Sequence, residues 1–282
     1  MKTLRRFVAA LTPERKSAQV VGVMMMGCVA LTGEQVLGEC NINVPGVPDL
    51  DQKREEATGI PGLPNDGKMY CVPTSATDWF AYIANHGLPE VLDGPRDWQA
   101  QDNYNFVTNK VADVGELMGT DGVDGTNGLG QFFGTVSHLQ ATAPGAFTVT
   151  QAAAFPGLSV TPEMLYDALD NSGFVSMTLG SYKTDTFGHW KRVGGHIVAL
   201  HRVQNGCSDS PALWWRNPST GNSESMTQQA TFSSQDSEME EVTDLWATPI
   251  SAVGVSQTMW RFLRYENEEK QRFLDSFMTI TP

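Results

Sequence analysis

Residues 71–87 read CVPTSATDWFAYIANHG, and this stretch sets the first half of the expected fold. Its apolar side chains recur at helical spacing, Pro73 suits a first helical turn, and Gly87 suits a helix end. The pattern predicts a buried helix whose first residue is Cys71. The residues expected on its buried face are Val72, Ala76, Trp79, Phe80 and Ile83.

The chain changes from helical to strand-like patterns along its length. Helices are expected at 106–118 and 129–140, and strands at 174–179, 193–204 and 212–217. Helices followed by strands predict an α+β fold with a mainly antiparallel sheet. Further expected elements are a strand at 147–153, a short helix at 161–171, an acidic surface loop at 233–241, and strands at 241–246 and 259–265.

Composition excludes several classes of protein. The 282 residues are 40% hydrophobic and 18% charged, which suits one sizeable core or at most two small ones. Thirty-two acidic against nineteen basic residues give a net charge of −13, so no nucleic-acid partner is expected.

The N-terminus has the pattern of an export signal. A region with five basic residues precedes the apolar run VVGVMMMGCVAL at 20–31, which is too short to span a bilayer comfortably. We therefore expect a signal peptide at 1–33, a linker and entry loop at 34–66, and a folded domain at 67–282. The mature chain would be periplasmic or extracellular with no stable membrane span. A lipid anchor at Cys28 and a short N-terminal core helix are the weaker alternatives.

Cysteine arithmetic gives one expected disulfide. If Cys28 leaves with the signal, three cysteines remain, and an odd number in an exported protein suggests one pair and one free thiol. The simplest pairing joins Cys40 to Cys207 and leaves Cys71 free.

Three residues form a candidate catalytic set. A cysteine at a helix N-terminus has a stabilised thiolate, so Cys71 is the candidate nucleophile. His196 follows Gly194 and Gly195 at the start of an apolar strand, where space is left for a substrate. Asn217 ends the next strand and is placed to orient the imidazole. The alternatives are an inert core cysteine and a turn-forming Asn-Pro pair.

The other histidines and the glycine-rich loop offer no metal or cofactor site. We expect His201 to be structural, His189 to lie at a cleft rim, and two others, His86 and His138, to be capping or surface residues. The histidine spacing is not that of a zinc site, and the 121–128 loop lacks the acidic pattern of a calcium loop. We expect that loop to be a tight surface loop that could rim the cleft.

Three separated motifs carry a family resemblance. Tyr70-Cys71-Val-Pro-Thr-Ser, Gly194-Gly195-His196 and Trp215-Arg-Asn217-Pro218 are similar to the papain-like cysteine peptidases, most closely to the bacteriocin-leader-processing (double-glycine) branch. Phytochelatin synthases share much of the pattern. The resemblance implies a helical half bearing Cys71 packed on a β half bearing His196 and Asn217. It also implies that Asn65 stands where the family has its oxyanion-hole glutamine.

These features predict an exported cysteine hydrolase, a peptidase acting on peptide or protein substrates through an acyl-enzyme. Val72 stands where the family has glycine, and Asn65 is one methylene shorter than glutamine. Both departures favour the alternative of a catalytically inactive, binding version of the fold. A thiol acyltransferase with the same triad is a further alternative. The sequence does not set the oligomeric state.

Overall fold

The structure is a computed structural model that describes residues 40–54, 62–98, 100–154, 158–219, 235–248, 255–265 and 268–282. All of these belong to one unit of the chain, Leu37–Pro282. The expected signal peptide at 1–33, with Cys28, lies outside the described residues.

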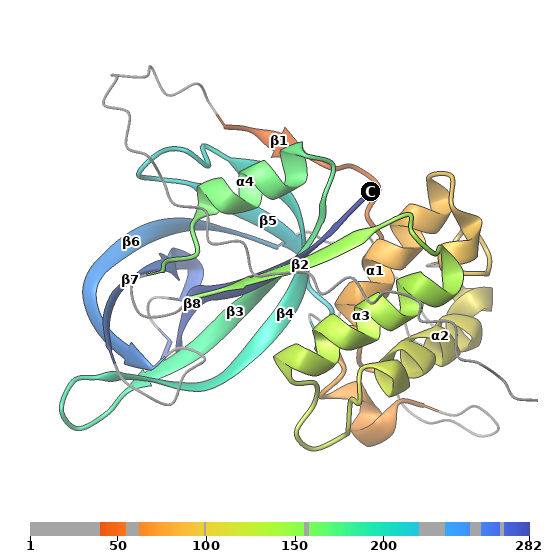
Figure 1. The fold of residues 1–282 in the computed structure, drawn as a ribbon. Helices are drawn as coiled ribbons and strands as arrows, with labels where there is room; N and C mark the ends of the chain where they lie inside the picture. Colours follow the sequence, from red (N-terminus) through yellow and green to blue (C-terminus); the bar gives the residue numbers. More distant parts are fainter. Residues whose placement is uncertain are drawn as a thin grey trace, which may run out of the picture. The chain divides into compact units, whose positions relative to one another are not determined.

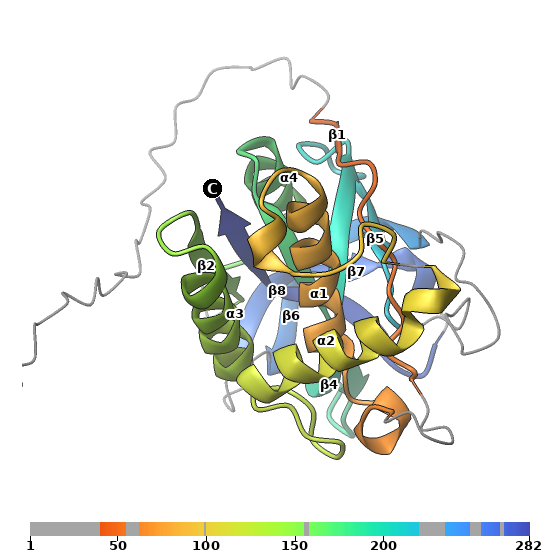
Figure 2. The ribbon, with the colours of Figure 1, turned by 90° about the vertical axis from the view of Figure 1, so that its right-hand side faces the viewer.

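Three helices, α1 (Cys71–Asn85), α2 (Tyr104–Leu117) and α3 (Gly128–Thr142), lie together on one side of the strands (Figures 1 and 2). On α1, Phe80 packs into an apolar cluster shared with α2 and α3. One residue earlier, Trp79 faces the strands, and its indole N–H donates to a strand carbonyl oxygen at 3.0 Å. Because both faces are covered, α1 is buried along nearly its whole length, which its run of apolar and small residues permits.

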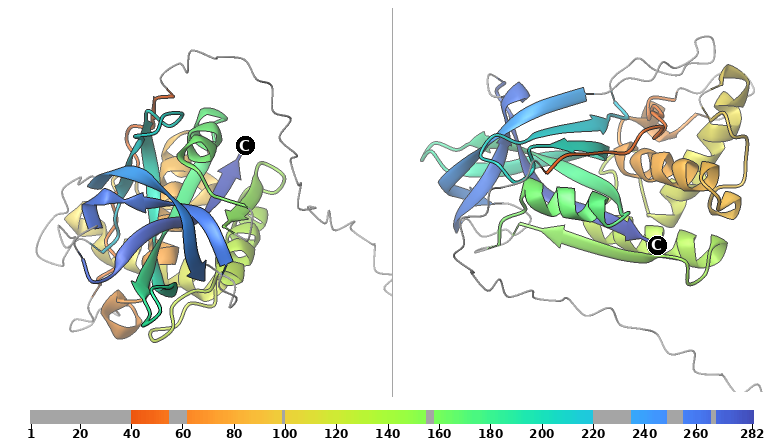
Figure 3. Two further views of the ribbon diagram at one scale, coloured as in Figure 1. Left: turned by 90° about the vertical axis from the view of Figure 1, so that its left-hand side faces the viewer. Right: turned by 90° about the horizontal axis from the view of Figure 1, so that it is seen from above.

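Six strands close into an antiparallel barrel (Figures 1 and 3). The neighbouring strands run in the order β4-β3-β8-β7-β6-β5. β5 then pairs with β4, with Ala199 opposite Arg216, and this pairing closes the ring. Closure leaves no strand of the ring with an unpaired edge. The main apolar cluster of the barrel includes Met177, Leu200, Trp215 and Phe262. The strands are β3 (Phe174–Thr184), β4 (Trp190–Gln204), β5 (Ala212–Arg216), β6 (Gln235–Thr248), β7 (Val255–Phe262) and β8 (Gln271–Thr281).

Shorter elements extend this framework. β1 (Ile42–Asn43) pairs with β4, and β2 (Thr148–Ala153) pairs with β8. α4 (Pro162–Asp170) begins after Thr161, whose hydroxyl accepts the N–H of Met164 at 3.2 Å. This N-cap and the proline at the first helical position explain where α4 starts.

The predicted fold class, an α+β papain-like fold, is wrong. The described chain forms a closed six-stranded antiparallel barrel with four α-helices, and sheet predominates. The sequence patterns did not predict β8, which pairs with both β3 and β7 and so completes the ring. β8 is hidden in the sequence because Asp275 interrupts its apolar run and forms the extra residue of a bulge opposite Thr178 and Leu179.

Most individual elements are confirmed. The helix that begins at Cys71, the helices near 106–118 and 129–140, and the strands at 193–204 and 212–217 are present with bounds shifted by a few residues. The acidic run was misjudged, because from Gln235 onward it belongs to β6. Along β6 the buried Ser237 and Met239 alternate with Asp236 and Glu238, which are exposed, so the strand turns its carboxylates outward.

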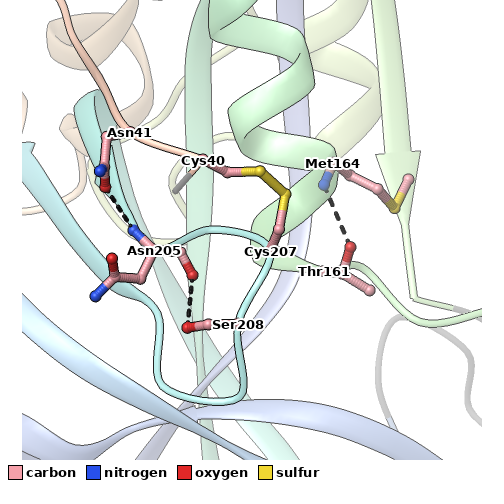
Figure 4. Close-up of a disulfide and its surroundings, with 7 residues drawn as sticks. All are labelled: Cys40, Asn41, Thr161, Met164, Asn205, Cys207 and Ser208. Carbon is pink, nitrogen blue, oxygen red and sulfur yellow. Dashed lines mark hydrogen bonds between the residues drawn. A yellow bond between two sulfur atoms is a disulfide. The ribbon is translucent and has the colours of Figure 1, made fainter. Parts of the chain in front are cut away.

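The predicted Cys40–Cys207 disulfide is present, with the two Cα atoms 5.5 Å apart, and Cys71 is free (Figure 4). Beside the bridge, the N–H of Asn205 donates to the side-chain oxygen of Asn41 at 2.8 Å. The bridge and this bond fix the start of residues 40–54, which we call the strap. The strap falls within the expected linker and has little regular structure, yet Val47, Leu50 and other side chains in it are buried.

None of the helices in the described ranges combines the length and the apolar character that crossing a membrane requires.

Candidate active site

The nucleophile candidate, Cys71, is the first residue of α1. Tyr70 precedes the helix, and its carbonyl oxygen accepts the N–H of Thr74 at 3.1 Å, which fixes the first turn. The Cys71 side chain is partly buried, and the next residue, Val72, is 4% exposed and packs into the helical core. Val72 and Cys71 both line a cavity, so the Val72 side chain, at a position where the peptidases it resembles have glycine, forms part of the wall beside the thiol.

Burial raises the pKa of the Cys71 thiol. The backbone N–H groups of Ile197, Val72 and Cys71 itself bond to the sulfur and act in the opposite direction, in that order of size. The sequence analysis expected the helix N-terminus to lower this pKa, and that expectation is wrong here because desolvation outweighs the N–H donors. The thiol is therefore neutral at rest near pH 7.

The imidazole candidate, His196, lies on β4 opposite Leu179 of β3. Its Nε2 is 2.6 Å from the Oδ1 of Asn217, the first residue after β5. The predicted pairing of His196 with Asn217 is thus formed. The two residues meet because β4 and β5 are adjacent antiparallel strands, which brings the end of β5 back beside the middle of β4.

Two residues that sequence reasoning missed hold Asn217. Its Nδ2 donates to the Oε1 of Gln235 on β6 at 2.8 Å. Its Oδ1 also accepts the backbone N–H of Ser219 at 3.0 Å and the hydroxyl of the same serine at 3.1 Å. The Ser219 hydroxyl also lies 3.4 Å from the Nε2 of His196. Ser219 follows Asn217 by two residues and could have been suspected from that spacing, whereas nothing in the sequence indicates Gln235.

This network assigns the tautomer of His196. The amide nitrogen of Asn217 donates to Gln235, so the oxygen faces the ring, and an amide oxygen can only accept. Nε2 therefore carries the proton and Nδ1 has a free lone pair. Burial lowers the pKa of His196 to about 4, against the effect of the Asn217 hydrogen bond and with smaller contributions from the charges of Arg272 and Lys53. The ring is neutral near pH 7.

The backbone of β4 beside His196 lies near Cys71, but neither His196 nor Asn217 is among the residues that line the cavity next to Cys71. One of the three backbone N–H groups at the Cys71 sulfur belongs to Ile197, the residue directly after His196. Among the described residues, however, no hydrogen bond joins the His196 ring to the Cys71 sulfur. A catalytic contact that is open without substrate and tightens on binding is common in enzymes.

The fourth predicted residue, Asn65, is not brought to the site by any contact of the described chain. Asn65 lies in a short 3₁₀ helix, Pro64–Gly67, its side chain is exposed, and its Nδ2 donates to the carbonyl oxygen of Gly122 at 2.9 Å. It does not line the cavity that contains Cys71. The amide that was expected to bind an oxyanion is directed to the 121–125 loop in this structure.

The cavity beside Cys71 has a volume of about 1170 Å³ and an open mouth. β4 contributes Gly194, Gly195 and Ile197 to its lining, and residues 123–128 line it as well. Asp121 holds that loop by accepting the N–H groups of Val123 and Asp124 at 2.7 and 2.6 Å. The expectations that this loop and His189 rim a cleft are both confirmed.

The remaining histidines have structural contacts. His201 is 7% exposed, His138 stacks on Phe80 and contacts the carbonyl oxygen of Val91, and His86 caps the end of α1. Within the described ranges, no three or more side chains of His, Cys, Asp or Glu gather in a way that could hold a metal ion.

The sequence matches no protein-family model and no curated protein. A function for the chain therefore has to be argued from the arrangement of Cys71, His196 and Asn217.

Proposed function

We propose that the protein is an exported cysteine hydrolase, acting on peptide bonds, in which Cys71 is the nucleophile, His196 the general base and acid, and Asn217 the residue that orients His196. One observation carries the proposal. The 2.6 Å bond from the Nε2 of His196 to Asn217 leaves a lone pair on Nδ1 of the same ring, and the next residue, Ile197, contributes a backbone N–H to the free thiol of Cys71. An inert core cysteine needs neither an oriented imidazole nor an open cavity.

The chemistry follows from two neutral groups. As the sulfur of Cys71 attacks the substrate carbonyl carbon, its proton passes to the Nδ1 of His196, and the imidazolium then protonates the leaving amine as the C–N bond breaks. Water next attacks the thioester with His196 as base, releasing the acid and restoring the thiol. The backbone N–H of Cys71 would donate to the oxyanion, and Asn65 would join it only if it left Gly122.

Export is supported by the oxidised state of two cysteines. Disulfides persist in the periplasm and outside the cell and are rare in the cytosol. The signal peptide at 1–33 and a periplasmic or extracellular location are part of the proposal.

The test is intact-mass analysis after incubation with an electrophilic peptide probe, such as a peptidyl vinyl sulfone. We expect one adduct on Cys71 in the native protein, none in Cys71→Ser, and labelling slowed by about 10² or more in His196→Ala. His189→Ala is the matched control, since His189 lines the cavity that contains Cys71 and its ring pairs with Asp185, and its labelling rate should change by less than about threefold. Equal labelling of native protein and His196→Ala would refute the proposal.

A second candidate is a non-catalytic domain whose cavity binds a partner. The raised pKa of Cys71 and the absence of a hydrogen bond from its thiol to His196 in the described chain favour it. The same experiment separates the two, because a binding domain would label no faster than an ordinary buried thiol and would be indifferent to His196→Ala.

A further inference from the structure

The strap, residues 40–54, contacts both sides of the proposed active site. On the strand side, the N–H of Val44 donates to the carbonyl oxygen of His201 at 2.7 Å, and the side chain of Arg216 donates to the carbonyl oxygen of Val47 at 3.1 Å. On the helix side, the N–H of Leu50 donates to the carboxylate of Asp78 on α1 at 2.9 Å. A single segment therefore spans the boundary between α1 and the barrel.

Gln52 makes the contacts closest to the catalytic residues. Its side chain is 3% exposed, and its Nε2 donates to the carbonyl oxygens of Gly67 at 3.0 Å and Lys68 at 2.8 Å. These carbonyls lie four and three positions before Cys71 in the sequence, and the Gly67 oxygen also accepts the N–H of Tyr70 at 3.0 Å. The side-chain amide of Gln52 thus fixes the turn that precedes Cys71 and the start of α1.

The backbone of Gln52 contacts the strand side of the proposed site. Its N–H donates to the carbonyl oxygen of Pro218 at 2.8 Å, and Pro218 directly follows Asn217. The fit is close, since a Cβ on Gly67 would lie 1.6 Å from the backbone oxygen of Gln52, and Gly67 has a φ of +71°. Only glycine is compatible with both the contact and this backbone conformation.

We propose that Gln52 is a positioning residue that sets the placement of Cys71 relative to the His196–Asn217 pair. The inference rests on the proposed function, because it assigns Gln52 a role through these residues and no contact with substrate. An error of about 1 Å in such a placement can cost about 10² in rate, so the two amide bonds matter beyond their contribution to stability. The Cys40–Cys207 disulfide anchors the strap that holds Gln52.

The test measures the second-order rate of Cys71 alkylation by iodoacetamide between pH 5 and 9. It uses the full chain with its disulfide intact, as native protein, Gln52→Leu, His196→Ala and the double variant, with peptide mapping to confirm the labelled residue. We expect Gln52→Leu to slow alkylation about tenfold or more in the native background and to have no further effect when His196 is absent. The matched control is Gln257→Leu, since Gln257 is 8% exposed, lies on β7 and donates to the sulfur of Met259.

The outcomes separate the two proposals. If His196→Ala slows alkylation but Gln52→Leu does not, or slows it equally in both backgrounds, the positioning role is wrong and the proposed function stands. If His196→Ala leaves the rate unchanged, the proposed function fails and the positioning role fails with it. Should Gln52→Leu not fold, Gln52→Asn keeps the amide but loses one methylene of reach, and the same cycle is measured with it. Slowing by Gln257→Leu equal to that by Gln52→Leu would also overturn the positioning role.

Discussion

The two sides of the proposed site are held by different kinds of interaction. On the helix side, the sulfur of Cys71 is met by three backbone N–H groups and lies against an apolar core. On the strand side, the ring of His196 is held by a chain of side chains that runs through Asn217 to Ser219 and Gln235. The nucleophile thus depends on where the backbone runs, and the base depends on which side chains surround it.

This difference has a consequence for mutation. Side-chain substitutions near Cys71 should act mainly through packing, and the turn held by Gln52 is the exception. Substitutions in the His196 chain should act directly on the tautomer and orientation of the ring. Both sides are electrically neutral at rest, since burial raises the pKa of the thiol and lowers that of the imidazole.

The largest effect is expected on the strand side, for Asn217→Ala. Loss of the Oδ1 acceptor frees the ring and removes the group that keeps the proton on Nε2, so probe labelling of Cys71 should slow by about 10² to 10³. Ser219→Ala is the comparison. It removes the 3.1 Å hydroxyl bond to Asn217 but keeps the backbone N–H bond to Oδ1 and the Asn217–His196 bond, so a smaller change of less than about fivefold is expected. If Asn217→Ala labelled as fast as native protein, the His196 ring would not depend on its side-chain partners as described above.

The next effect is a pH dependence set by the strand side. With the pKa of His196 at about 4, the acid limb of Cys71 labelling should fall near pH 4 instead of near the ordinary histidine value of about 6.5. The rate is measured from pH 3.5 to 7 for native protein and His196→Gln. An acid limb centred above pH 6 would show that the ring is not buried in the neutral form.

The same histidine should make stability fall as the pH falls. Its folded pKa is below its unfolded pKa, so the stabilisation is complete above about pH 6.5 and is lost toward pH 4, on the order of 3 kcal/mol. Burial also lowers the pKa of His201 to about 4, so this residue adds a slope of the same sign. Urea unfolding at pH 7 and pH 4.5 measures the change. His196→Gln should reduce the slope, and an unchanged slope would count against the assignment.

The smallest effect is expected on the helix side, for Asp78→Asn. Asp78 is fully buried on α1, accepts the N–H of Leu50, and burial raises its pKa well above the usual value. Because the pKa of Asp78 is raised in the folded state, ionising its carboxyl group lowers the stability as the pH rises through that pKa. The side-chain oxygen of an asparagine can accept the same N–H of Leu50 without this cost. We expect the free energy of unfolding at pH 7 to change by less than about 1 kcal/mol. A loss of 3 kcal/mol would show an ionised, paired carboxylate there.

The fold could be predicted element by element but not as a whole. Periodicity located α1, and β4 and β5, because their apolar patterns are long and continuous. The ring closure depends on β8, where Asp275 breaks the pattern. This buried residue pairs with Arg192 of β4 at 2.7 Å. A tertiary ion pair of this kind leaves no local trace in the sequence.

The site was predictable where neighbouring residues carry the chemistry. Glycines beside His196 and a strand end at Asn217 were sufficient to pair the two residues, and cysteine arithmetic gave the disulfide. The protonation states were not predictable, since desolvation is a property of the packed chain and it reversed the expected effect of the helix terminus on Cys71. Gln235 and Gln52 were missed because each acts from a segment distant in the sequence.

The disulfide between Cys40 and Cys207 requires an oxidising environment, yet Cys71 has to stay reduced within the same chain. Thiol–disulfide exchange proceeds through a thiolate that can reach its target, and a partly buried thiol with a raised pKa is a poor attacker of a disulfide. Early formation of α1 would therefore keep Cys71 from pairing with Cys40 or Cys207 during oxidative folding. The burial that slows the resting nucleophile also protects the molecule from pairing the wrong sulfurs.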